Sequence, residues 1–436
     1  MISLRVSLVL VLVLGASASG CAAWPRRWSD RPCCIDTKPA VRRQPIWWHL
    51  FDVTVLEPLE QPFHLVRPGR RLIGVPMQAI NLDDGRLAGS AFFTGRDPAS
   101  LTPEQVRWGP TRPDDVAVPP FTVTKSKQEG KTAGFFVVDA RGERYLFKLD
   151  PVEAPELLSG AEVITSKLLY ALGYRVPSYE AVDARPEEFR VAPDAVIKDG
   201  AKEAPFTEDH LRELLAPRVR QGTVRMVSSK LIDGEVLGPA RFKQFRDCAD
   251  VRALKLAYAW VNNIDTKDHN SLLAWNGTET LGYLIDFGTA LGADAGAGGP
   301  KDPCAGWKYI VDLKETSLEM ATLGRHRTAC DTDPSPPDAR LGLFSERVDP
   351  RRWKPYAPNL AFKEMTDEDA EWMALRMRRL SRAQLEAAVA AGRYSDPEAE
   401  RRLVNVLEAR RWTIINAYLD DDEDDDEDED EEVARQ

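Results

Sequence analysis

The chain has 436 residues, of which 43% are hydrophobic and 29% are charged, a composition that permits a sizeable globular core. This length predicts two or three compact units, or one two-lobed domain with extensions. The formal net charge of −11 is concentrated in residues 420–432, which carry thirteen negative charges, and the chain without them has a formal charge of +2. A nearly neutral body argues against a nucleic-acid-binding protein, which needs a strongly basic surface.

Residues 1–20 have the pattern of a signal peptide. A basic residue, Arg5, precedes the apolar run at 8–15, which is too short to cross a bilayer comfortably as a helix of the mature protein. No later segment of the sequence is long and apolar enough to span a membrane. We therefore expect an exported chain that is attached to a membrane through a lipid anchor at most.

The four residues "ASGC" that end at Cys21 resemble a bacterial lipobox, in which the cysteine is acylated. Ala18 stands where that pattern usually has leucine, and ordinary cleavage after residues 16–18 is the alternative. With Cys21 lipidated, the expected location is the bacterial cell envelope, where disulfides are permitted. Among the other cysteines we expect a bridge between Cys304 and Cys330, and no cysteine–histidine cluster indicates zinc.

The order of predicted elements is strand-rich first and helix-rich later. Residues 21–115 predict a linker and an N-terminal extension with many turn signals. Strand patterns follow at 121–126, at 134–150 with a turn at 139–142, and at 224–232. This order predicts an α+β protein with two lobes, at 116–235 and 236–419.

Helical patterns begin at 159–174, where Ser159 is the predicted N-cap and Gly173 the stop. A second helix is expected at 250–263. Further helices are expected after two predicted capping boxes, Thr366 with Asp369 and Ser381 with Gln384, and after Ser395, which precedes Pro397. The acidic residues 420–436 predict a solvated, disordered tail, and binding of a cation or a basic partner is the alternative.

Two short acidic loops lie close together in the sequence, "NNIDTKDHN" at 262–270 and "YLIDFGTAL" at 283–291. Between them, β-like runs flank Asn276-Gly277, a strong hairpin signal. A hairpin centred near residue 278 places Asn270 opposite Asp286 at its open end. The upstream pair Asp265 and Lys267 then faces the same cleft.

These four side chains suit phosphoryl transfer. A carboxylate and a carboxamide provide oxygen ligands for Mg²⁺ or Mn²⁺ held beside phosphate oxygens. Asp265 is placed to orient or deprotonate a hydroxyl, and Lys267 to stabilise a transferred phosphoryl group. The alternative is a pair of capped turns in which these residue types coincide by chance.

The segment "DTKDHN" resembles the D-x-K-x-x-N catalytic loop of protein kinases, and "DFG" at 286–288 resembles their metal-binding triplet. The resemblance implies that Asp265 is the catalytic base and that Lys267 stabilises phosphate. It also implies that Asn270 and Asp286 are the metal ligands. Asn263 departs from the family pattern, which often has histidine at that position.

The upstream half contains a possible nucleotide site. Lys148 lies in an apolar strand, where a lysine needs a partner, and Glu162 on the next helix is the candidate. This resembles the strand-lysine and helix-glutamate pair of kinases. A surface lysine on an edge strand is the alternative, and Glu153 and Glu156 compete with Glu162.

The turn at 127–137 includes Gly130, Lys131 and Gly134, which we expect to bring backbone amides to the phosphates of ATP. An ordinary hairpin explains these residues equally well.

The stretches "FKLDP", "ALGY", "NIDTKDHN" and "LIDFGTALG" are similar to those of atypical kinases of the HipA-like, CotH-like and secretory-pathway types. The segments "FFTGRDPASLTPEQVRWGP", "WKPYAPNLAF" and "RYSDPEAERRLVNVLEARRW" resemble a family of bacterial envelope lipoproteins. Together the similarities cover roughly residues 88–419. They imply a two-lobed kinase-like fold with a site for ATP and Mg²⁺ or Mn²⁺.

The resulting expectation is an ATP- and metal-dependent phosphotransferase outside the cytoplasm, acting on a hydroxyl of a protein, a glycan or a small molecule. One alternative is an inactive pseudokinase that acts as an envelope scaffold, favoured by the lack of a standing ATP pool in the periplasm. Another is adenylyl transfer from ATP on the same fold. The presence of all four loop residues favours the transferase.

Overall fold

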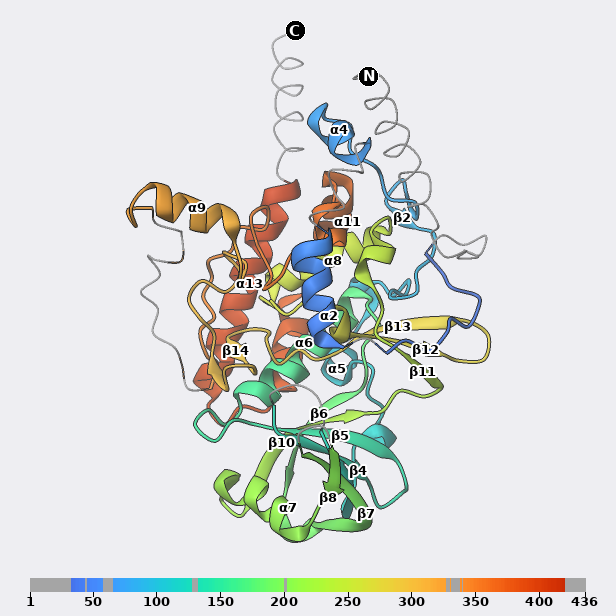
Figure 1. The fold of residues 1–436 in the computed structure, drawn as a ribbon, viewed down its shortest axis with the longest axis vertical. Helices are drawn as coiled ribbons and strands as arrows, with labels where there is room; N and C mark the ends of the chain where they lie inside the picture. Colours follow the sequence, from blue (N-terminus) through green and yellow to red (C-terminus); the bar gives the residue numbers. More distant parts are fainter. Residues whose placement is uncertain are drawn as a thin grey trace, which may run out of the picture.

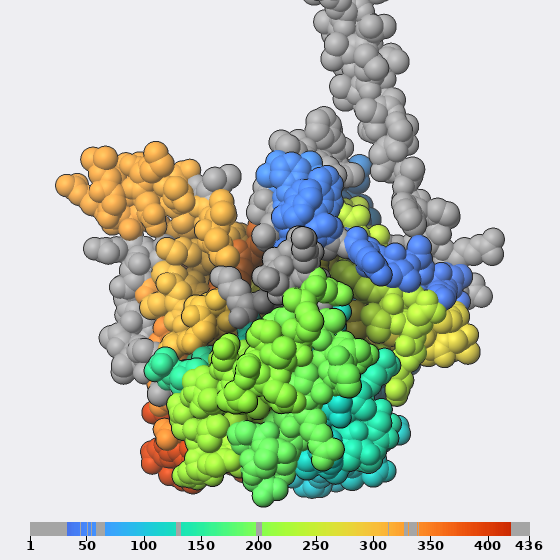
Figure 2. All heavy atoms as spheres, turned by 60° about the horizontal axis from the view of Figure 1, so that its bottom comes forward, coloured from blue at the N-terminus to red at the C-terminus, as the bar shows by residue number. Residues whose placement is uncertain are grey.

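The computed structural model of the chain describes residues 33–43, 45–57, 66–127, 132–199, 202–326, 330, 338 and 340–419. The predicted signal peptide, Cys21, Gly130, Lys131 and the acidic tail lie outside these residues. The fold is α+β with a strand-rich part and a helical part, as the sequence predicts (Figure 1). Seen from the strand-rich end, the green and cyan residues form one body, and the orange residues around 313–321 project beside it (Figure 2).

The strand-rich lobe is built on an eight-stranded sheet with the order β6-β10-β5-β4-β3-β7-β8, and β9 pairs with β10. The pairing of β3 with β7 is parallel, and the other pairs are antiparallel. The strands are β3 (Phe121–Ser126), β4 (Gly134–Val138), β5 (Arg144–Leu149), β6 (Tyr179–Ala184), β7 (Phe189–Asp199), β8 (Lys202–Pro205), β9 (Val219–Arg220) and β10 (Thr223–Lys230). The predicted strands at 121–126, 134–150 and 224–232 are confirmed.

One face of this sheet forms an aromatic core. Phe121, Phe147 and Phe189 are buried, with ring centroids 5.0 Å apart for Phe121 and Phe147 and 5.2 Å apart for Phe121 and Phe189. Helix α7 (Glu208–Leu215) contributes Leu211 and Leu215 to the same cluster. Because side chains alternate along β5, burying Phe147 on this face turns Lys148 to the other.

Helix α6 (Leu157–Leu172) lies between the sheet and the helical lobe, and nearly all of its residues are buried. The predicted stop at Gly173 is confirmed, since Gly173 has a left-handed φ of 112°. The predicted N-cap is wrong: the helix begins at Leu157, and Ser159 lies inside its first turn. The reason is that a carboxylate from outside the helix, Asp150, takes over the capping role.

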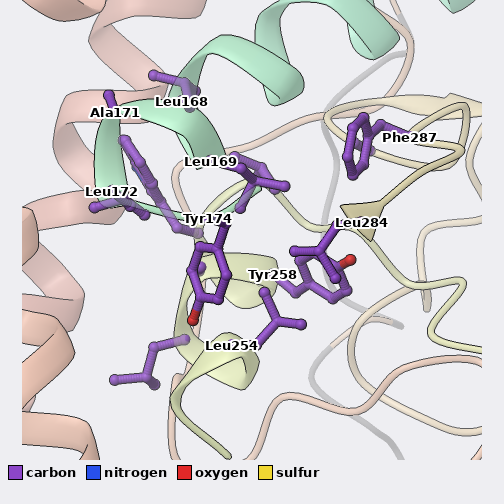
Figure 3. Packing of buried hydrophobic residues seen from close by; sticks show 14 of the residues in the cluster. Leu168, Leu169, Ala171, Leu172, Tyr174, Leu254, Tyr258, Leu284 and Phe287 are labelled. Atoms are coloured by element: carbon purple, nitrogen blue, oxygen red, sulfur yellow. The ribbon is translucent and has the colours of Figure 1, made fainter. Parts of the chain in front are cut away.

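The helical lobe surrounds α8, which is the second predicted helix. Apolar residues of α6 and α8 pack together with Leu284 and Phe287, as Figure 3 shows. The helices of this lobe are α8 (Ala249–Trp260), α9 (Leu313–Ala321), α10 (Leu360–Lys363), α11 (Asp367–Arg378), α12 (Arg382–Ala390) and α13 (Pro397–Leu419).

Both predicted capping boxes, at Thr366 and Ser381, are confirmed. The predicted cap Ser395 is wrong by one residue. The carboxylate of Asp396 accepts from the backbone N–H of Glu398 at 2.9 Å, and Ser395 N–H donates to Glu156 instead.

Several described segments between residues 33 and 115, expected to be a linker and an extension, pack against the helical lobe, whereas α4 buries none of its residues. Cys33 forms a disulfide with Cys248 immediately before α8. The ring of Phe93 lies 5.1 Å from those of Tyr174 and Trp372. The small elements here are α2 (Ile46–Phe51), a π-helical turn (Asp52–Leu56), α4 (Val66–Leu72), β1 (Leu82–Asp83), β2 (Arg86–Leu87) and α5 (Pro103–Trp108), and α5 packs on α6 and α12.

The predicted bridge between Cys304 and Cys330 is present, whereas the bridge between Cys33 and Cys248 was not predicted. Within the described ranges, no helix combines the length and apolarity needed to cross a bilayer.

Asp250 gives a test of this packing. Its buried carboxylate accepts from Asn81 at 2.9 Å and from Ser90 at 2.5 Å, which ties the N-terminal segment to the first turn of α8. Burial raises the pKa of Asp250 from 3.8 to about 6, although the hydrogen bonds from Ser90 and Asn81 oppose this. The folded state therefore binds this proton more tightly than the unfolded state.

We predict that the stability contributed by protonated Asp250 is complete below pH 3.8 and is lost as the pH rises through about 6. The shift corresponds to roughly 3 kcal/mol. Denaturant unfolding of the native chain and of Asp250→Asn across this range should show their stability difference moving in favour of the variant as pH rises. A difference independent of pH would contradict the prediction.

Candidate active site

The two acidic loops flank the predicted hairpin, formed by β12 (Ser271–Trp275) and β13 (Thr280–Leu284), with β11 (Glu235–Gly238) beside β12. The register differs by one residue from the prediction. Ile285 N–H donates to the carbonyl of Asn270 at 3.0 Å, so Asn270 lies opposite Ile285, and Asp286 is the next residue. The physical reason is a tight turn, in which Asn276 N–H donates to the carbonyl of Glu279.

Lys148 is the centre of the site. Its buried ammonium lies 2.5 Å from Glu162 Oε1 and 2.9 Å from Asp286 Oδ1. The other oxygen of Glu162 accepts from the backbone N–H of Phe287 at 3.1 Å. The predicted pairing of Lys148 with Glu162 is therefore present, and the same carboxylate also holds the "DFG" segment.

Asp150, which the sequence analysis did not single out, sets the position of α6 relative to β5. Its two oxygens accept from Ser159 N–H at 2.8 Å and from Ser159 Oγ at 2.7 Å. Asp150 is two residues after Lys148, and Ser159 is three residues before Glu162. This contact therefore fixes the separation of the lysine and its glutamate, and an aspartate just after a strand was the available sequence signal.

The electrostatics of this buried group favour a charged lysine. Burial alone would lower the pKa of Lys148, but the charges of Asp286 and Glu162 outweigh it and raise the pKa. Burial would raise the pKa of Asp286, but Lys148 and Lys127 outweigh it and hold that pKa well below its usual range. Burial raises the pKa of Glu162 despite Lys148. One ammonium thus faces two carboxyl groups.

Asp286 is held in a strained backbone conformation, with a φ of 62° that non-glycine residues rarely adopt. Its N–H donates to the hydroxyl of Tyr179 at 3.3 Å, and the Tyr179 ring lies 5.7 Å from that of Phe287. The side chain of Asp286 remains 36% exposed. The strain therefore holds a carboxylate that is anchored at one oxygen and still partly exposed to solvent.

The other loop is tied to the "DFG" side through Thr289. Asp265 N–H donates to Thr289 Oγ1 at 3.3 Å, and that hydroxyl donates to Asn263 Oδ1 at 2.9 Å. Asn263, which departs from the kinase pattern, thus holds the loop by an uncharged hydrogen bond. Lys267 Nζ donates to the carboxylate of Asp265, so the predicted base and phosphate-stabilising lysine are in direct contact.

Asn270 has an unused acceptor, which tests whether a cation fits here. Its Nδ2 donates to the carbonyl of Asp265 at 2.7 Å, which leaves Oδ1 buried with no hydrogen-bond partner among the described residues. A hard cation satisfies such an oxygen, and Asp286 supplies a carboxylate from the loop after β13. In the described part of the chain, no three His, Cys, Asp or Glu side chains form a metal cluster. The donor set therefore suits a cation that takes its other ligands from phosphate.

The β3–β4 hairpin contributes a lysine that the sequence analysis missed. Lys127 lowers the pKa of Asp286, and burial together with Lys148 lowers its own pKa. The lysine was within the segment expected to bind phosphate, but only its glycines and Lys131 were singled out. Gly134 has a packing reason, because a Cβ there would lie 2.4 Å from the carbonyl of Phe147 in β5.

No protein-family model matches the chain, and no curated protein matches it. Among solved structures it is similar to the proinflammatory kinase CtkA of Helicobacter pylori, with 10% identity over 70% of this chain and 99% of that chain and a TM-score of 0.36. It is also similar to the Golgi casein kinase with Mn and ADP bound, with 9% identity, coverages of 70% and 75% and a TM-score of 0.28. For hydra Fam20 with sugar, the identity is 12%, the coverages are 74% and 98% and the TM-score is 0.28. Because these scores are low, we infer function from the contacts in the site.

The ion pairs of Lys148 with Glu162 and Asp286 predict that substitutions of these residues change the stability non-additively. Lys148→Met leaves the buried carboxyl group of Glu162 and the partly exposed one of Asp286 without their cation, and should lower the free energy of unfolding by about 3–5 kcal/mol. Adding Glu162→Gln removes one of the orphaned charges, so the double variant should be more stable than Lys148→Met alone.

Denaturant unfolding of the native chain, both single variants and the double variant measures this coupling. Arg212→Met is the control, because its ion pair with Asp209 is exposed, and it should change stability little. Strictly additive losses for Lys148→Met and Glu162→Gln would contradict a shared buried pair.

Proposed function

We propose that this protein is a phosphotransferase that transfers the γ-phosphoryl group of ATP to a hydroxyl acceptor. The observation that supports this best is the single ammonium of Lys148 shared by Glu162 and Asp286. A second is Asn270 Oδ1, which is buried and has no hydrogen-bond partner among the described residues, on the residue that pairs with Ile285 next to Asp286. The low-scoring likeness to kinases agrees with this proposal but adds little to it.

Each charged side chain of the cleft has a role in this proposal. Lys148, held by Glu162, binds the non-transferred phosphates, and Lys127 and Lys267 supply further positive charge. Asp265 accepts the proton of the acceptor hydroxyl. The oxygen of that hydroxyl forms a bond to the γ-phosphorus, while the bond between the γ-phosphorus and the leaving oxygen of ADP breaks. Lys267, in contact with Asp265, holds that carboxylate near the transferred group.

Asn270 and Asp286 are the residues that would hold Mg²⁺ or Mn²⁺, which supplies charge neutralisation at the phosphates when bound. The contact of Phe287 N–H with Glu162 orients the "DFG" segment, and Asn270 Nδ2 holds the backbone of Asp265. These contacts keep the metal-binding oxygens and the base on one rigid frame, which lowers the cost of ordering them in the reactive complex.

The proposed location is the bacterial cell envelope, with Cys21 as the lipid anchor. The disulfides Cys33–Cys248 and Cys304–Cys330 support exposure to an oxidising compartment. The proposed acceptors are serine or threonine hydroxyls of proteins, with glycan hydroxyls as the second class. Nucleotide and acceptor are the partners that the proposal requires.

ATP labelled in the α or the γ position distinguishes this proposal from its alternatives. Transfer of the γ label to an acceptor supports the phosphotransferase, and transfer of the α label instead identifies adenylyl transfer. A chain that shows no metal-dependent thermal shift with ATP is a scaffold with a kinase-like fold, and this result would reject the proposal.

Two substitutions separate binding from transfer. We predict that Asp286→Ala abolishes the metal-dependent thermal shift with ATP, because it removes a carboxylate ligand. Asp265→Ala should keep that shift and reduce γ transfer by about 10²–10⁴-fold, the usual contribution of a general base. The control is Asp194→Ala, which changes an exposed residue of β7. Undiminished transfer by Asp265→Ala would refute the assigned base.

A further inference from the structure

A basic cavity of about 490 Å³ lies in the helical lobe, apart from the Lys148 site. Its walls are aromatic and cationic, and they come from α8, α9, α10 and the loops before them. The charged residues of the lining are Lys255, Lys314, Glu315, His326, Arg351, Arg352, Lys354 and Lys363, and the aromatic ones are Trp307, Tyr309, Trp353 and Phe362.

The positive charge of this cavity is compensated in part, since Arg351 lies 3.3 Å from Asp367 and Arg352 lies 4.0 Å from Asp349. Lys354 is neutralised, since it lies 2.7 Å from Asp312 and 3.5 Å from Glu315. In the part of the chain that the structure describes, Lys255, Lys314 and Lys363 form no ion pair with a carboxylate. Lys255 donates instead to the carbonyl of Arg351 at 3.2 Å, and burial lowers its pKa. An anionic ligand would therefore be stabilised here.

The C-terminal end of the described chain lies at the rim of the same cavity. Arg351 Nη2 donates to the carbonyl of Ala417 at 2.7 Å, and its guanidinium carbon lies 4.5 Å from the centre of the Tyr418 ring. Leu419 ends α13, and the thirteen acidic residues 420–432 follow directly. The most acidic segment of the chain thus begins beside a basic cavity.

We propose that the acidic run 420–432 binds to this basic cavity of its own chain. Thirteen residues reach about 40 Å when extended, more than enough to cross the cavity from Leu419. A short tether also gives the acidic run an effective concentration of about 1 mM or more at the site. The two charge sets are opposite in sign, and three lysines of the cavity, Lys255, Lys314 and Lys363, form no ion pair with a described carboxylate.

A second basic cavity is a less suitable site for the acidic run 420–432 than the first one. Its volume is about 740 Å³, and its lining includes Arg218, Arg220, Arg225, Arg340 and Arg393. Arg225 and Arg393 are occupied by contacts between the lobes, to Gly392 and Asp183 among others. This cavity also adjoins Ser395, at the other end of the 23-residue helix α13, about 35 Å from Leu419.

The bound acidic run would lie against the segment that supports the Asp265 loop. Trp353 Nε1 donates to Asn262 Oδ1 at 2.9 Å, and Asn359 Nδ2 donates to the carbonyl of Thr266 at 3.4 Å. Both Trp353 and Asn359 line the basic cavity. A ligand in the basic cavity would therefore lie next to the loop that carries Asp265, without contacting the charged side chains of that loop.

The first test is zero-length carbodiimide cross-linking of the full chain at low salt. The expected products join residues 420–432 to Lys255, Lys314 or Lys363 and disappear at about 1 M NaCl, where surface charges are screened. Mixing isotopically light and heavy chains shows whether each product lies within one chain. Products joining two chains, or products only to lysines outside the lining of this cavity, would overturn the proposal.

The second test uses a fluorescent synthetic peptide with the sequence of residues 420–432. A full-length variant whose tail aspartates and glutamates are changed to asparagine and glutamine should bind it about tenfold more tightly than the native chain, because its cavity is free. In that variant, Lys314→Gln with Lys363→Gln should weaken binding about tenfold, whereas Arg220→Gln with Arg340→Gln should leave it unchanged. Equal affinity in the native and neutral-tail chains, or equal loss in both double variants, would overturn the proposal.

Discussion

The candidate site depends on the burial of one ammonium group, that of Lys148. Burying a charged lysine costs free energy unless its charge is matched, and here two carboxyl groups from separate elements provide the match. Glu162 comes from α6 and Asp286 from the loop after β13. The lysine therefore requires the sheet, the helix behind it and the hairpin of the other lobe to meet at one point.

The same arrangement leaves oxygen ligands in excess of the cations that face them. Two carboxyl groups surround Lys148, Asn270 Oδ1 lacks a hydrogen bond among the described residues, and Asp286 is strained and partly exposed. In a site with only a structural role, each of these features would lower the stability of the folded chain and serve no function. A site that binds a divalent cation and polyphosphate uses all of them, and for that reason the transferase explains the geometry better than a scaffold does.

The sequence predicted those features that depend on local pattern. Strand-like runs predicted β3, β4 and β5, and the Asn-Gly turn predicted the hairpin. A lysine in an apolar strand and the helix after it pointed to Lys148 and Glu162, and the hairpin spacing and loop motifs pointed to Asn270 and Asp286. The missed features depend on contacts between distant residues. Because of the Asp150–Ser159 contact, α6 begins earlier than predicted. Because of the hydrogen bond that closes the turn, the hairpin register differs by one residue from the prediction. The role of Lys127 depends on its position relative to Asp286 in the folded chain.

The N-terminal segment was missed for the same reason, and its contacts converge on one place. The disulfide from Cys33 to Cys248 and the hydrogen bonds of Asn81 and Ser90 with Asp250 all act on the first turn of α8. The last turn of α8 leads into the loop that carries Asp265, and Lys301 donates from the post-"DFG" segment to the carbonyls of Asn262 and Leu291. Since a helix is stiff, fixing its beginning also limits movement at its end. A segment without periodic pattern or recognisable motif thus braces the loop from the far side of the lobe, while Lys148 holds the opposite wall of the cleft.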